Sequence, residues 1–548
     1  MSAGTSSRRI ASMDQFRGYT VAGMFLVNFL GGYAAIHPVL KHNNNYFSYA
    51  DSIMPSFMFA VGFSFRLTYL RRRSQSSALS TVWTYVRRSL ALIVVSLVMY
   101  GVGTDFHNWA DFDKMPREFE PFRAKPPQTK VIEAATSTEQ KPDSTSPASQ
   151  DRKTGSETMD EIGDFIQPAV EQNADWDALS HARKMLVHWQ IFAGKLLKSD
   201  LWETLAIIGV TQIVVLPFIG CSFLTRFLAM IGLGITHCLL SYWFNWDFVY
   251  AINDTWLSKV LMTGDSRSWD GGLFGPISWG VAMMAGTLAY DLVVLSGSNA
   301  GAAGRLLAWG IVLMAIGYGM SCLTRLYELS PSELAARKQQ ILHVQAKKAA
   351  LERSLKPLIK EQAAKREAGE KGPAVDRLDA TIAVLQEKRH GWPDLELAES
   401  PVWPPWERLK GRTLSQLLVE PPFVAPPIDD PGVDPAPHIE HRPWNYWMMG
   451  KRMPSLSFIT FATGFAFALY GVFVVMCDVF GLRLGIFTTF GTNALAAYFL
   501  HHLVEEAVHP LVPHDVPLWY CLAGLVLFLV LTYGLVRFLE KRNIYIKL

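Results

Sequence analysis

The sequence predicts an all-α polytopic membrane protein with about ten transmembrane helices and two hydrophilic extracytoplasmic insertions. Half of its 548 residues are apolar and only 18% are charged, whereas soluble globular proteins carry about 25% charged residues. The charges are also segregated, because long apolar stretches alternate with two hydrophilic segments that hold most of the Lys, Arg, Asp and Glu. The net charge of +3 is too small to indicate nucleic-acid binding. We therefore expect a lipid bilayer around the chain and no nucleic-acid partner.

Ten stretches are long and apolar enough to span a bilayer, which requires about 20 residues in a helix. Gly, Asn or Thr interrupts the first and the ninth stretch, and this predicts helices that face the protein interior instead of lipid. The predicted spans lie near residues 19–38, 52–70, 86–103, 202–220, 224–245, 273–296, 304–323, 455–478, 484–503 and 517–538.

The basic residues of the short loops give an orientation. With ten spans, all of them fall on one side of the membrane, which the positive-inside rule makes the cytoplasmic side. Both termini are therefore expected in the cytoplasm. The basic residues concerned are Arg8, Arg9, Arg71, Arg72, Arg73, Arg87, Arg88, Arg226, Arg305, Arg483, Lys541, Arg542 and Lys547.

The first hydrophilic insertion should lie outside the cytoplasm and be partly disordered. Its middle is rich in Pro, Ser, Thr and charged residues, a composition typical of disorder. From about Asp175 to Lys198 the apolar spacing predicts a surface helix instead.

The second insertion should contain a helical hairpin. Ser330 and Glu333 form a capping-box pattern with Pro331 at the first helical position. A long helix is expected to about Arg366, and a second, antiparallel helix to about Lys388. The predicted organisation is 1–103 (first membrane helices with an active-site loop), 104–200 (first insertion), 201–325 (central membrane helices), 326–452 (hairpin and Pro-rich segment) and 453–548 (C-terminal membrane helices).

The densest cluster of chemically useful side chains lies near the N-terminus. Asp14 and Arg17 are three residues apart, so they can pair on one helix face and could simply anchor the first span. Asn28 lies within that span, where an amide can bond a neighbouring helix or stabilise a developing negative charge on an acyl oxygen. His42 follows the span and suits a general base, as does His37, although an isolated loop histidine is more often an ordinary surface residue.

A second cluster lies in the ninth predicted span. Asn493 and His501 are eight residues apart and should face the same way on a helix, beside Tyr498. His501 and Glu505 form an i,i+4 pair, but no HExxH-type spacing supports a metal, so no metal is predicted. Before the sixth span, Asp270 is a candidate N-terminal helix cap.

The N-terminal motifs resemble those of a known family. The opening pattern S-x-D-x-F-R-G is followed by V-N within the first span. K-H and then A-D come next, before a second span that is rich in Pro and Phe. Near the end of the chain, residues 491–494 form the pattern G-x-N-A. The matching residues at the start are Ser12, Asp14, Phe16, Arg17, Gly18, Val27, Asn28, Lys41, His42, Ala50, Asp51, Pro55 and Phe57. In this pattern the chain resembles the heparan-α-glucosaminide N-acetyltransferase family of membrane acyltransferases, in its bacterial ten-span form.

The resemblance implies an acetyl-CoA-dependent acyltransferase that moves an acetyl (acyl) group from cytoplasmic acetyl-CoA to an amino sugar or envelope glycan on the far side. His42 then corresponds to the family's active-site histidine, and Asn28 corresponds to the family's asparagine within the first span. Two alternatives stay open: the acyl group is transferred to a nitrogen or to an oxygen, and His42 acts as a general base or carries the acyl group itself. The chain departs from the family at Ile207, where the family has Arg, and in the Asn run 43–45. Residues expected to bind substrate or acetyl-CoA are Asp14, Arg17, Asp51, Asp270, Asn493, Tyr498 and His501.

A transporter or flippase for an envelope sugar or lipid is the alternative. Polar residues within spans would also suit a permeation path, but transporters often contain two related halves, and no such repeat is seen. Acyl transfer across the membrane predicts a continuous cavity lined by Asn28, His42, Asn493 and His501. The resemblance favours a bacterial inner membrane, with acetyl-CoA as co-substrate and no metal, and a homodimer is left open.

Overall fold

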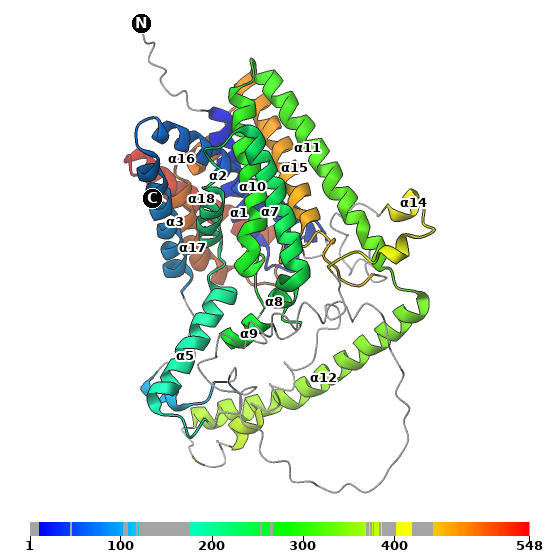
Figure 1. Cartoon of the computed structure of the whole chain (residues 1–548). Coiled ribbons are helices and arrows are strands. Elements are labelled where there is room, and N and C mark those ends of the chain that lie inside the picture. The colour runs from blue at the N-terminus through cyan, green and yellow to red at the C-terminus, as the bar shows by residue number, and fades with distance from the viewer. Residues whose placement is uncertain are drawn as a thin grey trace. The chain divides into compact units, whose positions relative to one another are not determined.

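In the computed structural model the described elements are all helices (Figure 1). They form two compact units. One comprises the described residues up to Ser321 and from Trp447 onward, and the other those from Cys322 to Tyr446. The structure describes residues 10–43, 46–101, 108–116, 119, 176–252, 255–263, 267–368, 402–418 and 442–546, with scattered positions between 372 and 385.

Seven segments within the described residues are long and apolar enough to cross a membrane. This confirms the prediction of an all-α polytopic membrane protein. The segments are α2 (Tyr49–Arg73), α3 (Ala78–Tyr100), α7 (Phe223–Leu240) continued to Tyr250 by η6 (Ser241–Asn245) and α8 (Trp246–Tyr250), η7 (Gly272–Phe274) with α10 (Gly275–Val294), α11 (Asn299–Ser321) with η8 (Cys322–Tyr327), α15 (Leu456–Val474) with η10 (Val475–Val479), and α18 (Leu518–Lys541).

The other three predicted spans are helical but shorter, more polar or broken. The first helix, α1 (Ala11–Leu30), begins and ends earlier than predicted, so the residues after Leu30 form a loop. α6 (Thr204–Val215) has only 12 residues. The ninth span is wrong as one continuous helix, because α16 (Gly485–Thr492) and α17 (Ala494–Val508) are separated at Asn493, whose ψ of 48° departs from helical geometry.

Glycines allow the closest helix crossings in the bundle. A Cβ atom on Gly62 of α2 would overlap the carbonyl oxygen of Met283 on α10, and one on Gly286 of α10 would overlap that of Phe59 on α2. Small residues at membrane helix interfaces permit this backbone approach. α2 and α10 therefore form a tight pair through the middle of the bundle.

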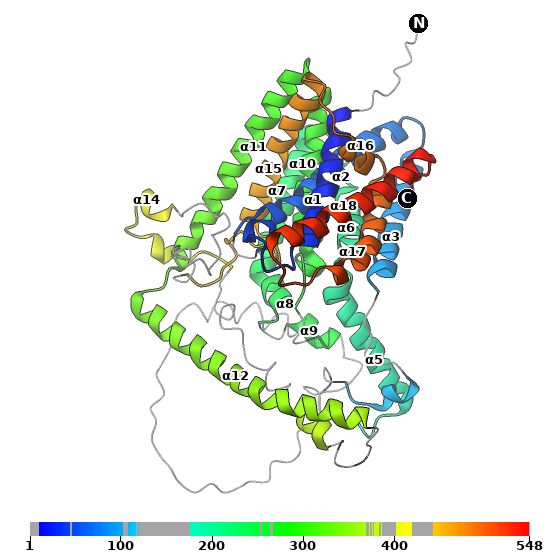
Figure 2. The same cartoon turned by 180° about the vertical axis from the view of Figure 1, so that it is seen from behind.

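α1 connects the two large apolar cores. Near its start, Phe16 packs with Phe59 in the core built mainly on α2, α10 and α15. Further along, Phe25 packs with Phe490 in a second core that includes α17 and α18. Figure 2 shows α1 between α15 and α18, both of which it contacts. The helix that carries Asn28 is thus held from both sides.

The described part of the first insertion packs around a small separate core that it shares with Met262. α5 (His181–Lys195), continued by η5 (Leu196–Asp200), confirms the predicted surface helix in its described part and packs near η2 (Trp109–Asp113) and α9 (Trp256–Leu261). The predicted disordered middle lies outside the described residues. The core consists of Phe119, Trp176, Val187, Ile191 and Met262.

The second unit contains the predicted hairpin helix. α12 (Pro331–Glu367) begins with the expected capping box, since the Ser330 amide donates to the Glu333 carboxylate at 2.7 Å and the Glu333 amide to Ser330 Oγ at 3.3 Å. Gln362 donates to Asp379 at 2.6 Å, which links α12 to helical residues after the turn. Two short elements follow, η9 (Trp406–Leu409) and α14 (Leu414–Leu417).

Candidate active site

His42 and Asp51 form a hydrogen-bonded pair at the start of α2. Ser48 is the N-cap of this helix, and Asp51 lies in its first turn with no exposed surface. The Asp51 carboxylate lies 2.9 Å from His42 Nδ1 and accepts hydrogen bonds from Ser48 Oγ at 2.7 Å and from the Asn43 amide at 3.1 Å. Three donors thus converge on one buried carboxylate.

The two partners of this pair differ sharply in exposure. The side chain of His42 is 47% exposed, whereas that of Asp51 is 0% exposed. An ionised carboxylate can only accept, so the neutral form of the His42 imidazole carries its hydrogen on Nδ1 and its lone pair on Nε2. A histidine oriented by a buried carboxylate, with its other nitrogen accessible, is the usual arrangement of a general base or nucleophile.

The surrounding loop is held by its own hydrogen bonds. Ser48 Oγ donates to the Lys41 carbonyl at 2.8 Å, and Asn43 Nδ2 donates to the same carbonyl at 3.1 Å. The competing candidate, His37, is exposed and accepts from the Val39 amide at 3.1 Å as the cap of η1 (Pro38–Leu40). The structure therefore pairs Asp51 with His42 and gives His37 a local capping contact.

Asn28 lies in the last turn of α1, at the end of the bundle where α2 begins. It is exposed, whereas its neighbours Val27 and Phe29 are buried. Val27 packs against Ala50 and Ile53, which flank Asp51. The amide predicted to act in catalysis is therefore on the helix that packs beside the His42–Asp51 pair.

The middle of α17 carries a polar stripe. His501 is fully buried, stacks on Phe25 with ring centroids 4.5 Å apart, and has its Nδ1 2.6 Å from the Tyr498 carbonyl oxygen. Next to it, His502 Nε2 lies 2.8 Å from the Tyr100 hydroxyl, which also contacts the hydroxyl of Tyr498. Tyr498 and His501 were predicted from the sequence as site residues, whereas Tyr100, at the far end of α3, was not.

Asn493 does not belong to that stripe, contrary to the sequence prediction. Its Nδ2 donates to the Ile544 carbonyl at 3.0 Å, and its Oδ1 accepts from the Ile546 amide at 3.2 Å. The helix is broken at this residue, so the eight-residue spacing does not bring Asn493 and His501 to one face. Its amide holds the segment that follows α18.

The predicted pair Asp14–Arg17 is confirmed, because Arg17 Nη2 lies 3.0 Å from Asp14 Oδ1. Arg17 Nε also donates to the Gly491 carbonyl at 2.8 Å. A Cβ atom on Gly491 would overlap the carbonyl oxygen of Asp14, and one on Gly18 would overlap that of Phe487. The pair thus lies where α1 and α16 cross closely.

Asp270 is not the predicted helix cap. The N-cap of α10 is Phe274, because the turn η7 lies between Asp270 and the helix. The Asp270 backbone has a positive φ of 49°, and its carbonyl accepts from Trp279 Nε1 at 3.0 Å. Its carboxylate instead lies 3.7 Å from Lys451 Nζ.

A second carboxylate that pairs within the helix bundle, Asp291 of α10, is 12% exposed and was not identified from the sequence. Its Oδ1 lies 3.4 Å from Nε of Arg66 on α2, and its Oδ2 forms a close ion pair with Arg226 on α7. Arg226 is fully buried and also donates to the Thr287 carbonyl at 2.8 Å. This cluster connects three membrane helices through charge.

Sequence patterns could have found part of what was missed. Ser48 and Asp51 are spaced as an N-cap and its N3 residue, which is a recognisable helix-start signal. Arg66 and Asp291 lie within predicted spans, where an ionisable side chain is a signal in itself, but nothing local predicts that they pair. No local signal identifies Tyr100, because its partners lie far away in the chain.

One known family matches part of the chain. The model of the heparan-alpha-glucosaminide N-acetyltransferase catalytic family matches residues 9–106. The matched stretch contains α1, α2 and α3, and with them Asn28, His42 and Asp51. The predicted resemblance is therefore confirmed over these residues, while the motifs after residue 106 lie beyond the match. No curated protein matches the chain.

Proposed function

We propose that this protein is a membrane-embedded acyltransferase that moves an acetyl group from cytoplasmic acetyl-CoA to an amino sugar or envelope glycan on the far side. One observation carries the proposal: a half-exposed histidine, His42, is hydrogen-bonded to the fully buried Asp51. The family match over the same segment gives this pair its chemical context.

His42 acts through its Nε2 atom. The acceptor's nitrogen or oxygen attacks the thioester carbonyl carbon while Nε2 removes the acceptor's proton. The C–S bond then breaks, and the CoA sulfur takes that proton from His42, which yields acetylated acceptor and free CoA. Asp51 holds Nδ1–H and stabilises the imidazolium formed between these two proton transfers.

Asn28 is proposed to stabilise the oxyanion. Its amide NH₂ can donate to the thioester oxygen as negative charge develops there. Tyr498 and His501 are proposed to line the acceptor's side of the site. Asp14, Arg17, Asp270 and Asn493 are proposed to act only through the elements that they hold together.

The proposed cellular setting rests on the family resemblance, and the proposed orientation rests on the basic residues of the short loops. We propose a bacterial inner membrane with both termini in the cytoplasm, where Arg-rich ends of the first helices meet the phosphates of CoA. A transporter is less well supported, because Asn493, one of its expected path residues, binds the segment after α18 instead.

Acyl transfer by the purified full chain in detergent tests the proposal. Acetyl-CoA is supplied with glucosamine or other amino and hydroxyl sugars, and CoA release is measured. We expect His42→Ala to lower the acceptor-dependent rate by about 10²–10⁴-fold, the usual contribution of a general base. The matched control is His37→Ala, which changes an exposed histidine of the same loop.

Three results have defined meanings. Full turnover by His42→Ala, or an equal loss in both variants, would contradict the assigned role of His42. No acceptor-dependent release by the wild type with any sugar would contradict the proposed function. A burst of CoA release without acceptor would show that His42 carries the acetyl group before transfer.

A further inference from the structure

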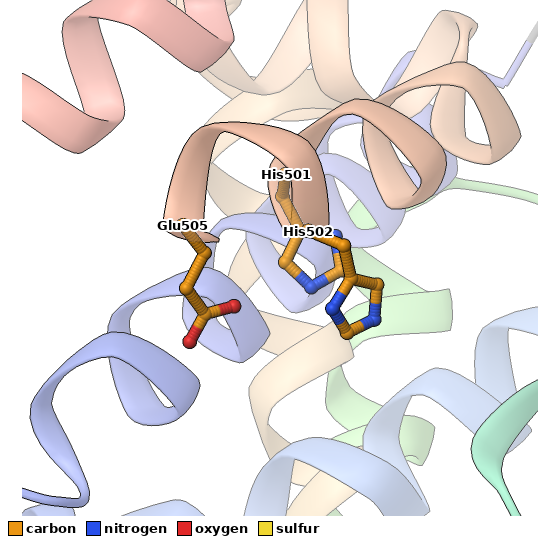
Figure 3. Close-up of side chains that lie close together, drawn as sticks. All are labelled: His501, His502 and Glu505. Atoms are coloured by element: carbon orange, nitrogen blue, oxygen red, sulfur yellow. The ribbon is translucent and has the colours of Figure 1, made fainter. Parts of the chain in front are cut away.

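α17 carries a cluster of three metal-ligand side chains to which acyl transfer assigns no chemical step. These are His501, His502 and Glu505, and they extend from the helix close to one another (Figure 3). Each offers one ligand atom, and these atoms all lie within 4.8 Å of one another. At 100° per residue, positions i, i+1 and i+4 fall on one side of a helix.

His501 is held in the form that a metal ligand requires. Its Nδ1 lies 2.6 Å from the Tyr498 carbonyl oxygen, which only accepts, so Nδ1 carries the hydrogen. Nε2 keeps its lone pair, is fully buried, and has no hydrogen-bond partner among the residues that the structure describes. A buried nitrogen in this state is uncommon and requires an explanation.

His502 is oriented in the same manner. Its Nε2 lies 2.8 Å from the Tyr100 hydroxyl, and in the tautomer that donates from Nε2 to this hydroxyl Nδ1 is the atom that can bind an ion. Metal-binding histidines usually use their second ring nitrogen for a hydrogen bond to a protein oxygen, which fixes the ring. Both imidazoles of the cluster show this pattern.

Glu505 supplies the negative charge. Its side chain is 17% exposed, and one of its oxygens lies 3.4 Å from His509 Nε2. Two neutral imidazoles and one ionised carboxylate on an apolar helix carry one negative charge, which attracts a divalent cation. The donor set of two nitrogens and one oxygen suits zinc, whereas calcium and magnesium prefer oxygen ligands alone.

We propose that His501, His502 and Glu505 form a binding site for a divalent transition-metal ion of the zinc class. Tetrahedral ligands at 2.0–2.2 Å from zinc are about 3.4 Å apart, so small side-chain rotations would complete the site. Three protein ligands leave a fourth position for water or a substrate atom. The spacing H-H-x-x-E differs from the HExxH pattern, which is why the sequence predicted no metal.

Zinc binding to the full chain tests this proposal without any enzymatic turnover. The protein is purified in detergent with a tag that contains no histidine, stripped with a chelator, and titrated with ZnCl₂ in a calorimeter. We expect about one zinc ion per chain. His501→Ala and the nearly isosteric Glu505→Gln should each weaken binding at least tenfold. His343→Ala, on an exposed position of α12, is the control and should bind zinc as the wild type does.

Three further measurements complete the test, and the first excludes variants that do not fold. Only variants that elute as a single species in size-exclusion chromatography are compared. CoCl₂ added to the wild type should give the strong visible absorption of low-coordinate cobalt, and Tyr100→Phe should weaken zinc binding about tenfold through the orientation of His502. Absence of the cobalt band together with no zinc uptake, or equal zinc uptake by His501→Ala, would overturn the proposal.

Discussion

The fully buried Asp51 and the largely buried Asp291, whose side chain is 12% exposed, have opposite kinds of partner. Asp51 holds a histidine that is 47% exposed, whereas Asp291 binds two arginines of which one, Arg226, is 0% exposed. Histidine can gain and lose a proton near neutral pH, but arginine stays charged. The same side-chain type thus serves a candidate proton-transfer site in one place and a permanent ionic connection in the other.

The two sites share α2 and are separated along it. Asp51 lies in the first turn and Arg66 fifteen residues later, about 22 Å along the helix axis. The Asp291 cluster holds α2 against α7 and α10, which fixes the helix whose first turn carries Asp51. The comparison suggests that a change at Asp291 should act on stability and a change at Asp51 mainly on turnover.

Asp291→Ala should have the largest effect on stability. It leaves Arg66 and Arg226 without their carboxylate, and the loss of one partner of a buried ion pair costs about 3–5 kcal/mol. The melting temperature in detergent should fall strongly, whereas Asp515→Ala, at an exposed position, should leave it unchanged. Equal melting temperatures for Asp291→Ala and Asp515→Ala would contradict the stabilising role that distinguishes Asp291 from Asp51.

Asp51→Asn should have a smaller effect on stability and a clear effect on rate. The amide NH₂ would face hydrogen-bond donors, and an unsatisfied buried group costs about 1–3 kcal/mol. His42 would lose its orienting acceptor, so the acetylation rate per folded molecule should fall while binding of acetyl-CoA persists. A rate that falls only in proportion to the amount of folded protein would show a purely structural role for Asp51.

Glu333, an exposed carboxylate of the second unit, should have the smallest effect. The Ser330 amide donates to it, and this hydrogen bond lowers the pKa of Glu333 below its ordinary value. Because the folded-state pKa is the lower one, its stabilisation exists above the unfolded pKa and is lost as pH falls through the folded pKa. Hydrogen exchange at the start of α12 should therefore be faster in Glu333→Ala than in the wild type at pH 7.

The same hydrogen-exchange experiment at acid pH supplies the control. Near pH 3, after correction for intrinsic exchange rates, the difference between Glu333→Ala and the wild type should shrink. A difference of the same size at both pH values would mean that the Glu333 charge does not stabilise the helix start.

Features that depend on local sequence patterns were predicted correctly, whereas long-range contacts were not predicted. The capping box at Ser330 and the Asp14–Arg17 pair were predicted because both partners lie within one helical turn. Apolar length predicted the seven long membrane segments for the same reason. The break at Asn493 was missed because its cause is a contact with residues 544 and 546.

The candidate site shows the same division. His42, Asn28 and Asp51 were identified by residue type and resemblance, but the His42–Asp51 hydrogen bond depends on how the loop folds back onto α2. The proposed cap at Asp270 was wrong because a glycine-rich turn displaces the start of α10. Residue identity could be read from the sequence, while the partner of each residue could not.

The contact at Asn493 also constrains the order in which the protein is assembled during translation. Its partners, Ile544 and Ile546, are synthesised 51 and 53 residues later. While those residues are still inside the ribosome, the corner between α16 and α17 lacks two of its hydrogen bonds. These two hydrogen bonds can therefore form only after α18 has been synthesised, and an insertase or chaperone would encounter the corner without them.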